Sequence, residues 1–278
     1  MREAPVRHPV ALQDVPETML WTLHNRAAEA ARADGYLRDP LALAMRGSID
    51  YDFDARFGPP DGSHGMRSRV FDDVVRPWLA LHPGGTVVEL GCGLETQFHR
   101  LDDGHVRWWC VDVPEALAVR ERFLAPTDRC RHLACSALDD AWLDAVDPRG
   151  PVFVTAQGLL MYFEPDAVRD LLATIARRLS QVDLLFDAIP RWFSRRTQKG
   201  FWKTPRYRAP PMPWGVDGDE LDPLLRDWLA RPFALQRVSY GPLRGVAGRV
   251  QWLLARTPVL RDRLPMIVHL RVGAIDGG

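Results

Sequence analysis

The sequence predicts an α/β fold in which helices flank a doubly wound, mostly parallel sheet. Between residues 86 and 187, short runs rich in β-branched and aromatic residues alternate with helical stretches, the pattern of successive strand–helix–strand units. The chain has 278 residues, 46% of them hydrophobic, so it can bury one large core. We therefore expect a single domain over residues 1–278.

Seven strands are expected in this sheet. Five occur in the alternating region and two apolar runs follow it, which gives strands at 86–90, 106–112, 131–135, 151–156, 182–187, 233–240 and 266–273. Pro165 suits a first helical turn, and the apolar residues that follow it recur at helical spacing up to Leu179. This helix should cover one face of the sheet. A further helical stretch, 247–256, separates the last two strands.

Two segments lie outside the alternating pattern. Residues 1–82 form an N-terminal helical part, with helices expected over 17–33 and 67–81. Residues 188–216 are rich in proline, arginine and aromatic residues and contain no acidic residue. Together with the helical stretch that follows, this segment is expected to form an inserted cap over 188–232.

Composition and charge argue against several classes of protein. The 36 basic and 36 acidic residues cancel, so the overall charge favours neither nucleic acid nor an anionic membrane as a partner. No apolar run approaches the roughly 18 residues of a membrane span, and the first residues lack the apolar stretch of a signal peptide. The 4 cysteines and 8 histidines show no metal-ligand spacing. We expect a cytoplasmic protein with free thiols and no metal.

The strongest local signal is the run VVELGCGLET at 87–96, in which an apolar strand passes through Glu89 into Gly91 and Gly93. Glycine permits a tight turn and a close approach of the backbone to a ligand. Asp112 ends the next expected strand, 21 residues after Gly91. In such a fold, a carboxylate there accepts hydrogen bonds from ribose hydroxyls. These residues predict a site for an adenosine-containing cofactor, although each alone also fits an ordinary turn or strand end.

The identity of that cofactor depends on two positions. A dinucleotide site usually has a third glycine that lets a helix pack beneath the pyrophosphate, and Thr96 stands there instead. The acidic Glu89 suits the cationic sulfonium and ammonium groups of S-adenosylmethionine (SAM) better than it suits phosphates. We therefore expect SAM as the cofactor and S-adenosylhomocysteine as the product. An NAD-dependent oxidoreductase is the less favoured alternative.

Several longer stretches of the chain resemble the leucine carboxyl and tetracenomycin-type polyketide O-methyltransferases, a branch of the class I SAM enzymes. The matching stretches occur in family order at residues 25–42, 67–73, 87–101, 111–115, 156–163, 184–190 and 210–215. The resemblance implies a Rossmann-like sheet of strand order 3-2-1-4-5-7-6 with an antiparallel last strand. It also implies a SAM-dependent O-methyltransferase.

The resemblance further implies residues that contact SAM. Arg69 corresponds to the family arginine that pairs with the SAM carboxylate, and Arg26 is implied as a second contact from the N-terminal helix. Ser136 and Ala137 correspond to positions that edge the adenine. Each has a structural alternative: Arg69 could pair with a neighbouring aspartate, Arg26 could lie on a solvated helix face, and the pair 136–137 could be an ordinary turn.

Gln157 departs from the family pattern. The family usually has Glu at this position, close to the SAM ammonium, whereas this chain has a neutral carboxamide. A carboxamide oxygen still accepts a hydrogen bond but lacks charge assistance. We therefore expect Gln157→Glu to tighten SAM binding, unless the pocket is rebuilt around the amide. A SAM-binding protein that has lost catalysis is an alternative. Glu95 likewise stands where Asp is expected, which the sequence does not explain.

The methyl acceptor is expected to be a small molecule, through a carboxylate or a phenolic hydroxyl of a polyketide-like secondary metabolite. A carboxylate is ionised at neutral pH and needs no base, whereas a phenol or alcohol needs one, and the sequence shows no clear Asp–His or Glu–His pair. Tyr162 is the candidate catalytic residue, as a hydrogen-bond partner of the substrate, although it could simply pack as an aromatic. A protein C-terminal carboxylate is the alternative acceptor.

The cap is expected to bind that acceptor. Seven cationic and six aromatic residues interleave within 188–216. Arginine can pair with a carboxylate or phenolate while an aromatic face stacks on a planar ring. We expect Arg195, Arg196, Trp202 and Trp214 to contact an anionic aromatic molecule. The alternative is a solvated basic loop whose aromatic residues pin it to the core.

Overall fold

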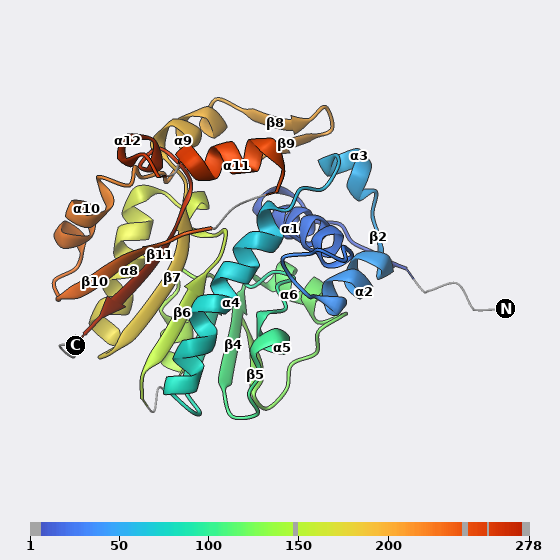
Figure 1. Ribbon diagram of the computed structural model, residues 1–278. Coiled ribbons are helices and arrows are strands. Elements are labelled where there is room, and N and C mark those ends of the chain that lie inside the picture. Colours follow the sequence, from blue (N-terminus) through green and yellow to red (C-terminus); the bar gives the residue numbers. More distant parts are fainter. Residues whose placement is uncertain (1–6, 147–149, 241–243, 255, 274–278) are drawn as a thin grey trace.

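The computed structural model of the chain describes residues 7–146, 150–240, 244–254 and 256–273. Within these ranges one seven-stranded sheet forms the centre of the molecule, with helices on both faces (Figure 1). The strands are β3 (Thr86–Leu90), β4 (Arg107–Asp112), β5 (Cys130–Ala134), β6 (Val152–Ala156), β7 (Val182–Ala188), β10 (Phe233–Val238) and β11 (Met266–Val272). The bounds of each lie within two residues of those expected.

The strand order is β10-β11-β7-β6-β3-β4-β5. The strands β3 to β7 run parallel to one another, and β11 runs antiparallel to both β7 and β10. Numbered along the chain, this is the order 3-2-1-4-5-7-6 with an antiparallel last strand, so the expected fold class is confirmed. The order reverses between β3 and β6, and such a switch point opens a crevice at the carboxyl ends of the strands.

Two long helices cover opposite faces of the sheet. α8 (Pro165–Arg178) packs into one hydrophobic cluster with Val88, and α4 (Ser63–Leu81) packs into another with Val87. Successive residues of a strand point to opposite faces, which is why these two valines belong to different clusters. Shorter helical elements follow the strands: α5 (Gln97–Leu101), α6 (Pro114–Arg120), α7 (Ala141–Ala145), the 3-10 turn η1 (Leu160–Tyr162), α10 (Leu221–Trp228), α11 (Gly245–Leu254) and α12 (Pro258–Arg261).

The N-terminal helices pack on the turn that follows β3. They are α1 (Asp14–Ala30), α2 (Pro40–Ser48) and α3 (Phe53–Phe57), joined by the short parallel pair β1 (His8–Pro9) and β2 (Ile49–Asp50). Their hydrophobic cluster includes Leu20 of α1 and Leu94 of that turn. The N-terminal part therefore closes one side of the crevice. In the described part of the chain, no helix combines the length and the hydropathy that a membrane crossing requires.

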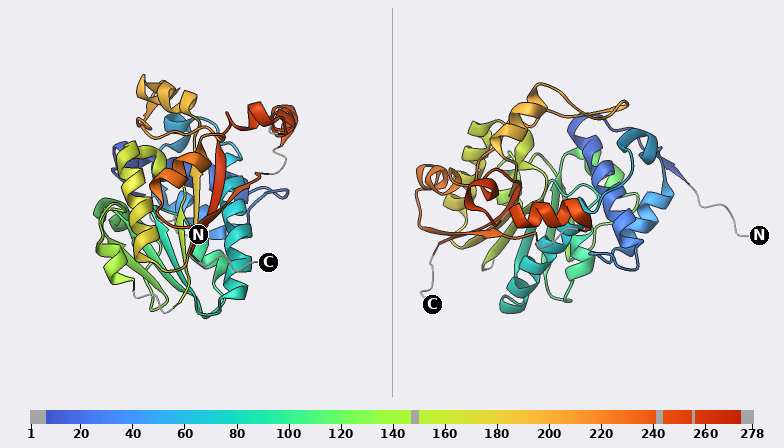
Figure 2. Two further views of the ribbon diagram at one scale, coloured as in Figure 1. Left: turned by 90° about the vertical axis from the view of Figure 1, so that its left-hand side faces the viewer. Right: turned by 45° about the horizontal axis from the view of Figure 1, so that its top comes forward.

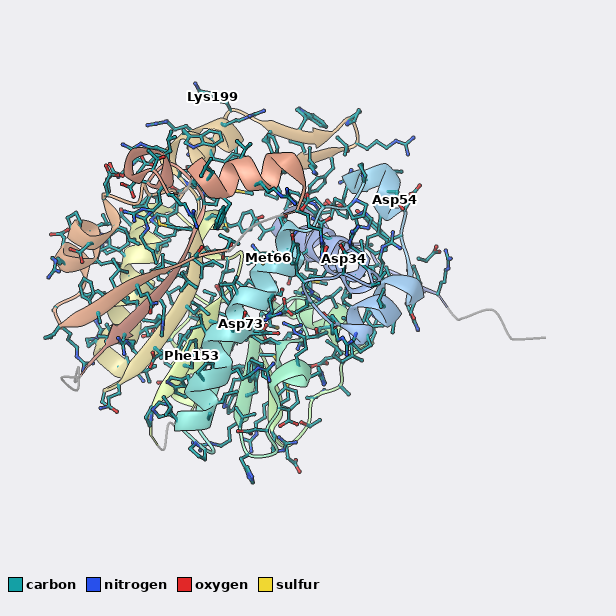
Figure 3. All side chains as sticks on the ribbon, viewed as in Figure 1. Asp34, Asp54, Met66, Asp73, Phe153 and Lys199 are labelled. Atoms are coloured by element: carbon teal, nitrogen blue, oxygen red, sulfur yellow. The ribbon has the colours of Figure 1, made fainter. Side chains whose placement is uncertain are left out.

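The cap consists of α9 (Arg191–Gln198) and a hairpin of β8 (Phe201–Thr204) and β9 (Tyr207–Ala209). Figure 2 shows it at the end of the molecule where α3 lies, and Figure 3 shows Lys199 at its outer rim. The hydroxyl of Thr204 donates to the Arg56 carbonyl at 2.7 Å, and Lys203 Nζ lies 5.5 Å from the centroid of the Trp21 ring. These contacts join the cap to α3 and α1.

Trp214 is not placed to contact an acceptor, contrary to the expectation from the sequence. Its side chain is 2% exposed and belongs to the hydrophobic cluster of the sheet, with its ring centroid 6.2 Å from that of Phe186 in β7. Trp202 on β8 is 61% exposed. The segment 210–216 explains the difference, because it returns the chain from the cap to the sheet. Trp214 is therefore a core residue.

This difference predicts unequal effects of two tryptophan substitutions. Trp214→Ala should lower the free energy of unfolding by about 3 to 5 kcal/mol, the cost of emptying a buried aromatic site. Trp202→Ala, the matched control, should change it by less than about 0.5 kcal/mol. Urea unfolding followed by circular dichroism measures both. Equal effects would show that Trp214 is not part of the core.

Candidate active site

A cavity of about 270 Å³ lies at the carboxyl ends of β3, β4 and β6, against α1. Its walls come from the turn after β3, the end of β4, the loop after β6 and one side of α1. The residues expected from the sequence that line it are Arg26, Glu89, Gly91, Gly93, Asp112, Ser136, Ala137, Gln157 and Tyr162. Arg69 is not in this lining, nor is any residue of the cap.

The two glycines of the turn are required by how closely other segments pack on it. Gly91 and Gly93 have φ angles of 64° and 44°, in the region that favours glycine. A Cβ on Gly91 would lie 2.8 Å from Leu159 Cδ1, and one on Gly93 would lie 2.9 Å from Met19 Cβ of α1. The bare backbone therefore lets α1 and the loop after β6 close on the cavity.

Asp112 holds this turn from the end of β4. Its Oδ2 accepts a hydrogen bond from the Gly93 N–H at 2.7 Å, and its Oδ1 accepts one from the Val113 N–H at 2.8 Å. Burial raises the pKa of Asp112, and the two backbone hydrogen bonds oppose that shift. A carboxylate offers about four lone-pair sites, so two of them stay free for the hydroxyl groups of a ligand.

A buried ion cluster fixes the other end of the turn. Glu95, 6% exposed, accepts hydrogen bonds from Arg26 Nη1 at 2.8 Å, Arg100 Nη1 at 2.7 Å, Ser68 Oγ at 2.8 Å and Gln157 Nε2 at 2.8 Å. Burial alone would raise the pKa of Glu95, but the two guanidinium groups outweigh it and hold that pKa well below its usual value. Glu95 is therefore an anion. These five residues, the Glu95 cluster, join α1, α4, α5 and the loop after β6.

Arg26 reaches the cavity wall, but its guanidinium is already engaged. Besides its bond to Glu95, its Nη2 donates to the Leu94 carbonyl at 2.6 Å, and its Nε lies 3.5 Å from Asp39 Oδ2. The side chain is 2% exposed, and among the described residues its Nε has no hydrogen-bond partner. Its observed contacts hold the turn against α1, while the sequence implied a contact with the cofactor.

Arg120, which the sequence analysis did not single out, supports the same turn. It is fully buried, and its Nη1 donates to the carbonyl oxygens of Gly93 at 2.9 Å and Glu95 at 2.6 Å. No local pattern marks this arginine, because those carbonyls lie 27 and 25 residues earlier in the chain. Its role becomes visible only when α6 packs beneath the turn.

Arg120 also lies beside a cluster of metal-ligand types that the sequence spacing did not reveal. Cys110, Cys130 and His132 place their ligand atoms within 4.8 Å of one another, and the two sulfur atoms are 3.7 Å apart. The Arg120 guanidinium lies 3.3 Å from Cys110 Sγ and 3.3 Å from His132 Nε2. A fixed positive charge already lies against these atoms, which disfavours a metal ion there. The four cysteines are free thiols.

Glu89 does not supply the charge that the sequence interpretation gave it. It is 2% exposed, and its Oε2 accepts a hydrogen bond from Trp108 Nε1 at 3.1 Å. Burial raises the pKa of Glu89 well above its ordinary value. Burial therefore disfavours the charged form of Glu89, on which the sequence-based choice of SAM over NAD relied.

Comparison with known proteins decides the family. Residues 19–176, more than half of the chain, match the model of the leucine carboxyl methyltransferase family. The chain belongs to this family. It is 28% identical over 260 residues to the tetracenomycin polyketide synthesis O-methyltransferase TcmP of Streptomyces glaucescens, an alignment that covers 92% of this chain and 89% of that protein.

Two further similarities agree with this assignment. A protein of Mycolicibacterium gilvum, named as an S-adenosyl-L-methionine-dependent methyltransferase, is 33% identical over 54% of this chain and 59% of its own length. The solved structure of the small RNA methyltransferase HEN1 superposes with a TM-score of 0.51 at 16% identity, covering 79% of this chain and 26% of that chain, which supports the fold alone. The chain is a SAM-dependent O-methyltransferase, as the sequence predicts.

The cavity of this methyltransferase fits its cofactor. Gly91 and Gly93 line it at the carboxyl end of β3, and Asp112 keeps two lone-pair sites for ribose hydroxyls. Ser136 and Ala137 line the same wall beyond Asp112. These features match the adenosine half of SAM.

Arg69, which the sequence assigned to the SAM carboxylate, does not line the cavity. Arg69 is 53% exposed and pairs with Asp73 at 2.8 Å, one turn further along α4. Arg67 lines the cavity instead: its Nη1 donates to Asp187 Oδ2 at 2.8 Å, and its Nε has no hydrogen-bond partner among the described residues. Helical spacing gives the reason, because Arg67 stands four residues before the buried Phe71, whereas Arg69 shares the outer face with Asp73.

Tyr162 lines the cavity at the end of η1. Burial raises the pKa of Tyr162 to about 12. The phenol is therefore protonated at neutral pH, so it can donate a hydrogen bond to an acceptor but cannot serve as a base.

The two arginines of α4 provide a matched test of this site. Arg67→Lys keeps a charge beside Asp187 but removes the planar donor group that faces the cavity, so the Kd for SAM should rise about tenfold or more, the loss of one hydrogen bond to a charged group. Arg69→Lys should leave the Kd within about twofold, because exposed ion pairs contribute little. Titration calorimetry measures both. Loss of affinity in the Arg69 variant alone would restore the original assignment.

Proposed function

We propose that this enzyme transfers the methyl group of SAM to a carboxylate of an anionic, polyketide-like small molecule. One observation supports the choice of a carboxylate: the described residues that line the cavity include no histidine, and the exposed Glu115 stands on α6 three residues after Asp112, which the proposal assigns to the ribose. Glu95 is held by two arginines, and burial raises the pKa of Glu89 well above its ordinary value and that of Tyr162 to about 12. A phenol or alcohol needs proton removal, whereas a carboxylate arrives ionised.

Several side chains are assigned to the cofactor in this proposal. Asp112 holds the ribose, Ser136 and Ala137 border the adenine, Arg67 pairs with the carboxylate and Gln157 accepts from the ammonium. Bound SAM supplies an electrophilic methyl group on its sulfonium. The protein must then bring an acceptor oxygen to about 3 to 3.5 Å from that carbon, in line with the departing sulfur.

The surroundings of Tyr162 support a place for the acceptor. Its hydroxyl is a donor at neutral pH, and Thr18 of α1 lines the same cavity. A donor on one carboxylate oxygen would orient the other toward the methyl group. Tyr162 thereby positions the acceptor, and it removes no proton from it.

The cap is proposed to attract the anion on its way to the cavity. Arg195 and Arg196 are exposed on α9 and form no ion pair with a described residue, and Arg196 lies 5.1 Å from the centroid of the Phe201 ring. Two other cap cations are neutralised across the fold: Arg191 pairs with Glu220, and Lys203 lies 3.8 Å from Asp61. Arg195 and Arg196, with the Phe201 ring next to Arg196, are the part of the cap that we assign to an aromatic acid.

The relatives support the choice of a small acceptor. TcmP, whose name describes a polyketide synthesis O-methyltransferase, aligns over 92% of this chain. The family model is named for leucine carboxyl methylation, which favours a protein C-terminal carboxylate as the second candidate. Both candidates are carboxylates, so the chemistry derived above applies to either.

A product assay tests the proposal directly. The enzyme and SAM are incubated with aromatic polyketide-type acids, with the matching phenols that lack a carboxyl group, and with a peptide ending in a free leucine carboxylate. Mass spectrometry should detect S-adenosylhomocysteine and a methylated product from the acids. That product should be hydrolysed by mild alkali, because it is an ester. An alkali-stable ether from the phenols would contradict the proposal, and turnover of the peptide alone would favour the second candidate.

The cap arginines give a kinetic test. Replacing Arg195 and Arg196 together by Gln should raise the KM for the acid roughly tenfold, the scale of one charged hydrogen bond, while the Kd for SAM stays unchanged. The matched control replaces two exposed arginines of α8, Arg177 and Arg178, by Gln and should alter neither value. An unaltered KM in the cap variant would leave these two charges without a role in the acceptor's binding.

A further inference from the structure

The carboxamide of Gln157 is held in one orientation. Its Nε2 donates to Glu95 Oε2 at 2.8 Å and to Ser68 Oγ at 3.3 Å, while that hydroxyl itself donates to Glu95 Oε2 at 2.8 Å. The reverse orientation would place an amide oxygen against a carboxylate oxygen, and both are acceptors only. Gln157 lines the cavity, and its Oε1 has no hydrogen-bond partner among the described residues. That oxygen is the atom left for a ligand.

Loss of the negative charge of Glu95, the residue that Gln157 contacts, would destabilise the protein. Glu95 is paired with Arg26 at 2.8 Å and with Arg100 at 2.7 Å, and its side chain is 7% exposed. Its Oε1 also accepts a hydrogen bond from the Thr96 N–H at 2.9 Å. Removing one partner from a buried ion pair leaves an uncompensated charge, which is strongly destabilising. Glu95 therefore stays ionised, and an ionised carboxylate only accepts hydrogen bonds. A side chain at position 157 that contacts Glu95 must accordingly be a donor.

We propose that Glu95 and Gln157 work as one unit at the amino-acid end of the cofactor. Glu95 is the positioning residue: its buried charge turns the Gln157 amide so that Oε1 accepts from the SAM ammonium. The family resemblance places an acidic residue at both 95 and 157, and this chain keeps only the one at 95. This inference rests on the cofactor orientation proposed above and is independent of the methyl acceptor.

The proposal reverses the expectation drawn from the sequence for Gln157→Glu. A carboxylate at 157 would face Glu95 Oε2 across the 2.8 Å that the amide hydrogen bond now spans. Such a side chain must either rotate away from the cluster or take up a proton, because like charges at this distance favour the protonated form of one partner. Only the protonated acid can reproduce both functions of the amide, donation to Glu95 and acceptance from the ammonium.

Four proteins test this unit: wild type, Gln157→Glu, Glu95→Gln and the double variant that exchanges the two residues. At about pH 8, Gln157→Glu should bind SAM roughly tenfold more weakly than wild type, the scale of one hydrogen bond to a charged group. Its Kd should recover toward the wild-type value as the pH falls to about 5, near the ordinary range of a carboxyl group. The wild-type Kd should lack this pH dependence. In the double variant the amide at 95 donates to the carboxylate at 157, so it should bind SAM more tightly than either single variant.

A truncated ligand separates this role from a purely structural one. 5′-Methylthioadenosine retains the adenosine and the sulfur but has no amino-acid end. Gln157→Leu and Gln157→Glu should weaken SAM and S-adenosylhomocysteine while leaving the Kd for methylthioadenosine within about twofold of wild type, because no lost contact reaches it. The proposal is overturned if Gln157→Glu binds SAM as tightly as wild type at every pH, if methylthioadenosine is weakened equally, or if the double variant has the wild-type circular dichroism spectrum and still shows no recovery.

Discussion

The buried carboxylate of Glu95 is the interaction on which the site depends. Its two carboxylate oxygens accept hydrogen bonds from side chains of α1, α4, α5 and the loop after β6. Taking such a charge out of water is costly, and it is compensated here only because two guanidinium groups and several neutral donors converge on it. The N-terminal helices are therefore not an appendage to the sheet. They supply Arg26, one of the two cations that let the turn after β3 carry a buried anion, and they form one wall of the cavity.

Two arginines hold this turn from opposite sides. Arg26 binds the Leu94 carbonyl from α1, and Arg120 binds the carbonyls of Gly93 and Glu95 from α6. Asp112 ties down the Gly93 N–H between them. The groups that face the cavity are thus fixed before a cofactor arrives, and preorganisation of this kind lowers the cost of binding. The cap is joined to α1 and α3, and α1 also forms a wall of the cavity. In the proposed function, the acceptor-binding cap and the cofactor site therefore both contact α1.

The sequence predicts the features that neighbouring residues determine. It does not predict those that depend on contacts between residues far apart in the chain. The strands and the Gly91 to Gly93 turn follow from local periodicity and backbone freedom, and Asp112 follows from its place at a strand end. The role of Arg120 could not be predicted, because it donates to backbone carbonyls that lie 27 and 25 residues earlier in the sequence. The place of Arg67 on the buried face of α4 could have been predicted from its spacing to Phe71. The family resemblance pointed to Arg69 instead. The meaning of Gln157 required its contact with Glu95, 62 residues away.

A crystal structure with S-adenosylhomocysteine tests the account most directly. The adenine should lie beside Ser136 and Ala137, the ribose hydroxyls on Asp112, and the ammonium on Gln157 Oε1, with the carboxylate near Arg67. The Glu95 cluster should be unchanged, with Arg26 still on Glu95 and the Leu94 carbonyl. The account is contradicted if Arg26 leaves Glu95 to bind the ligand carboxylate, if the Gln157 amide turns its nitrogen into the cavity, or if the nucleoside lies outside this crevice.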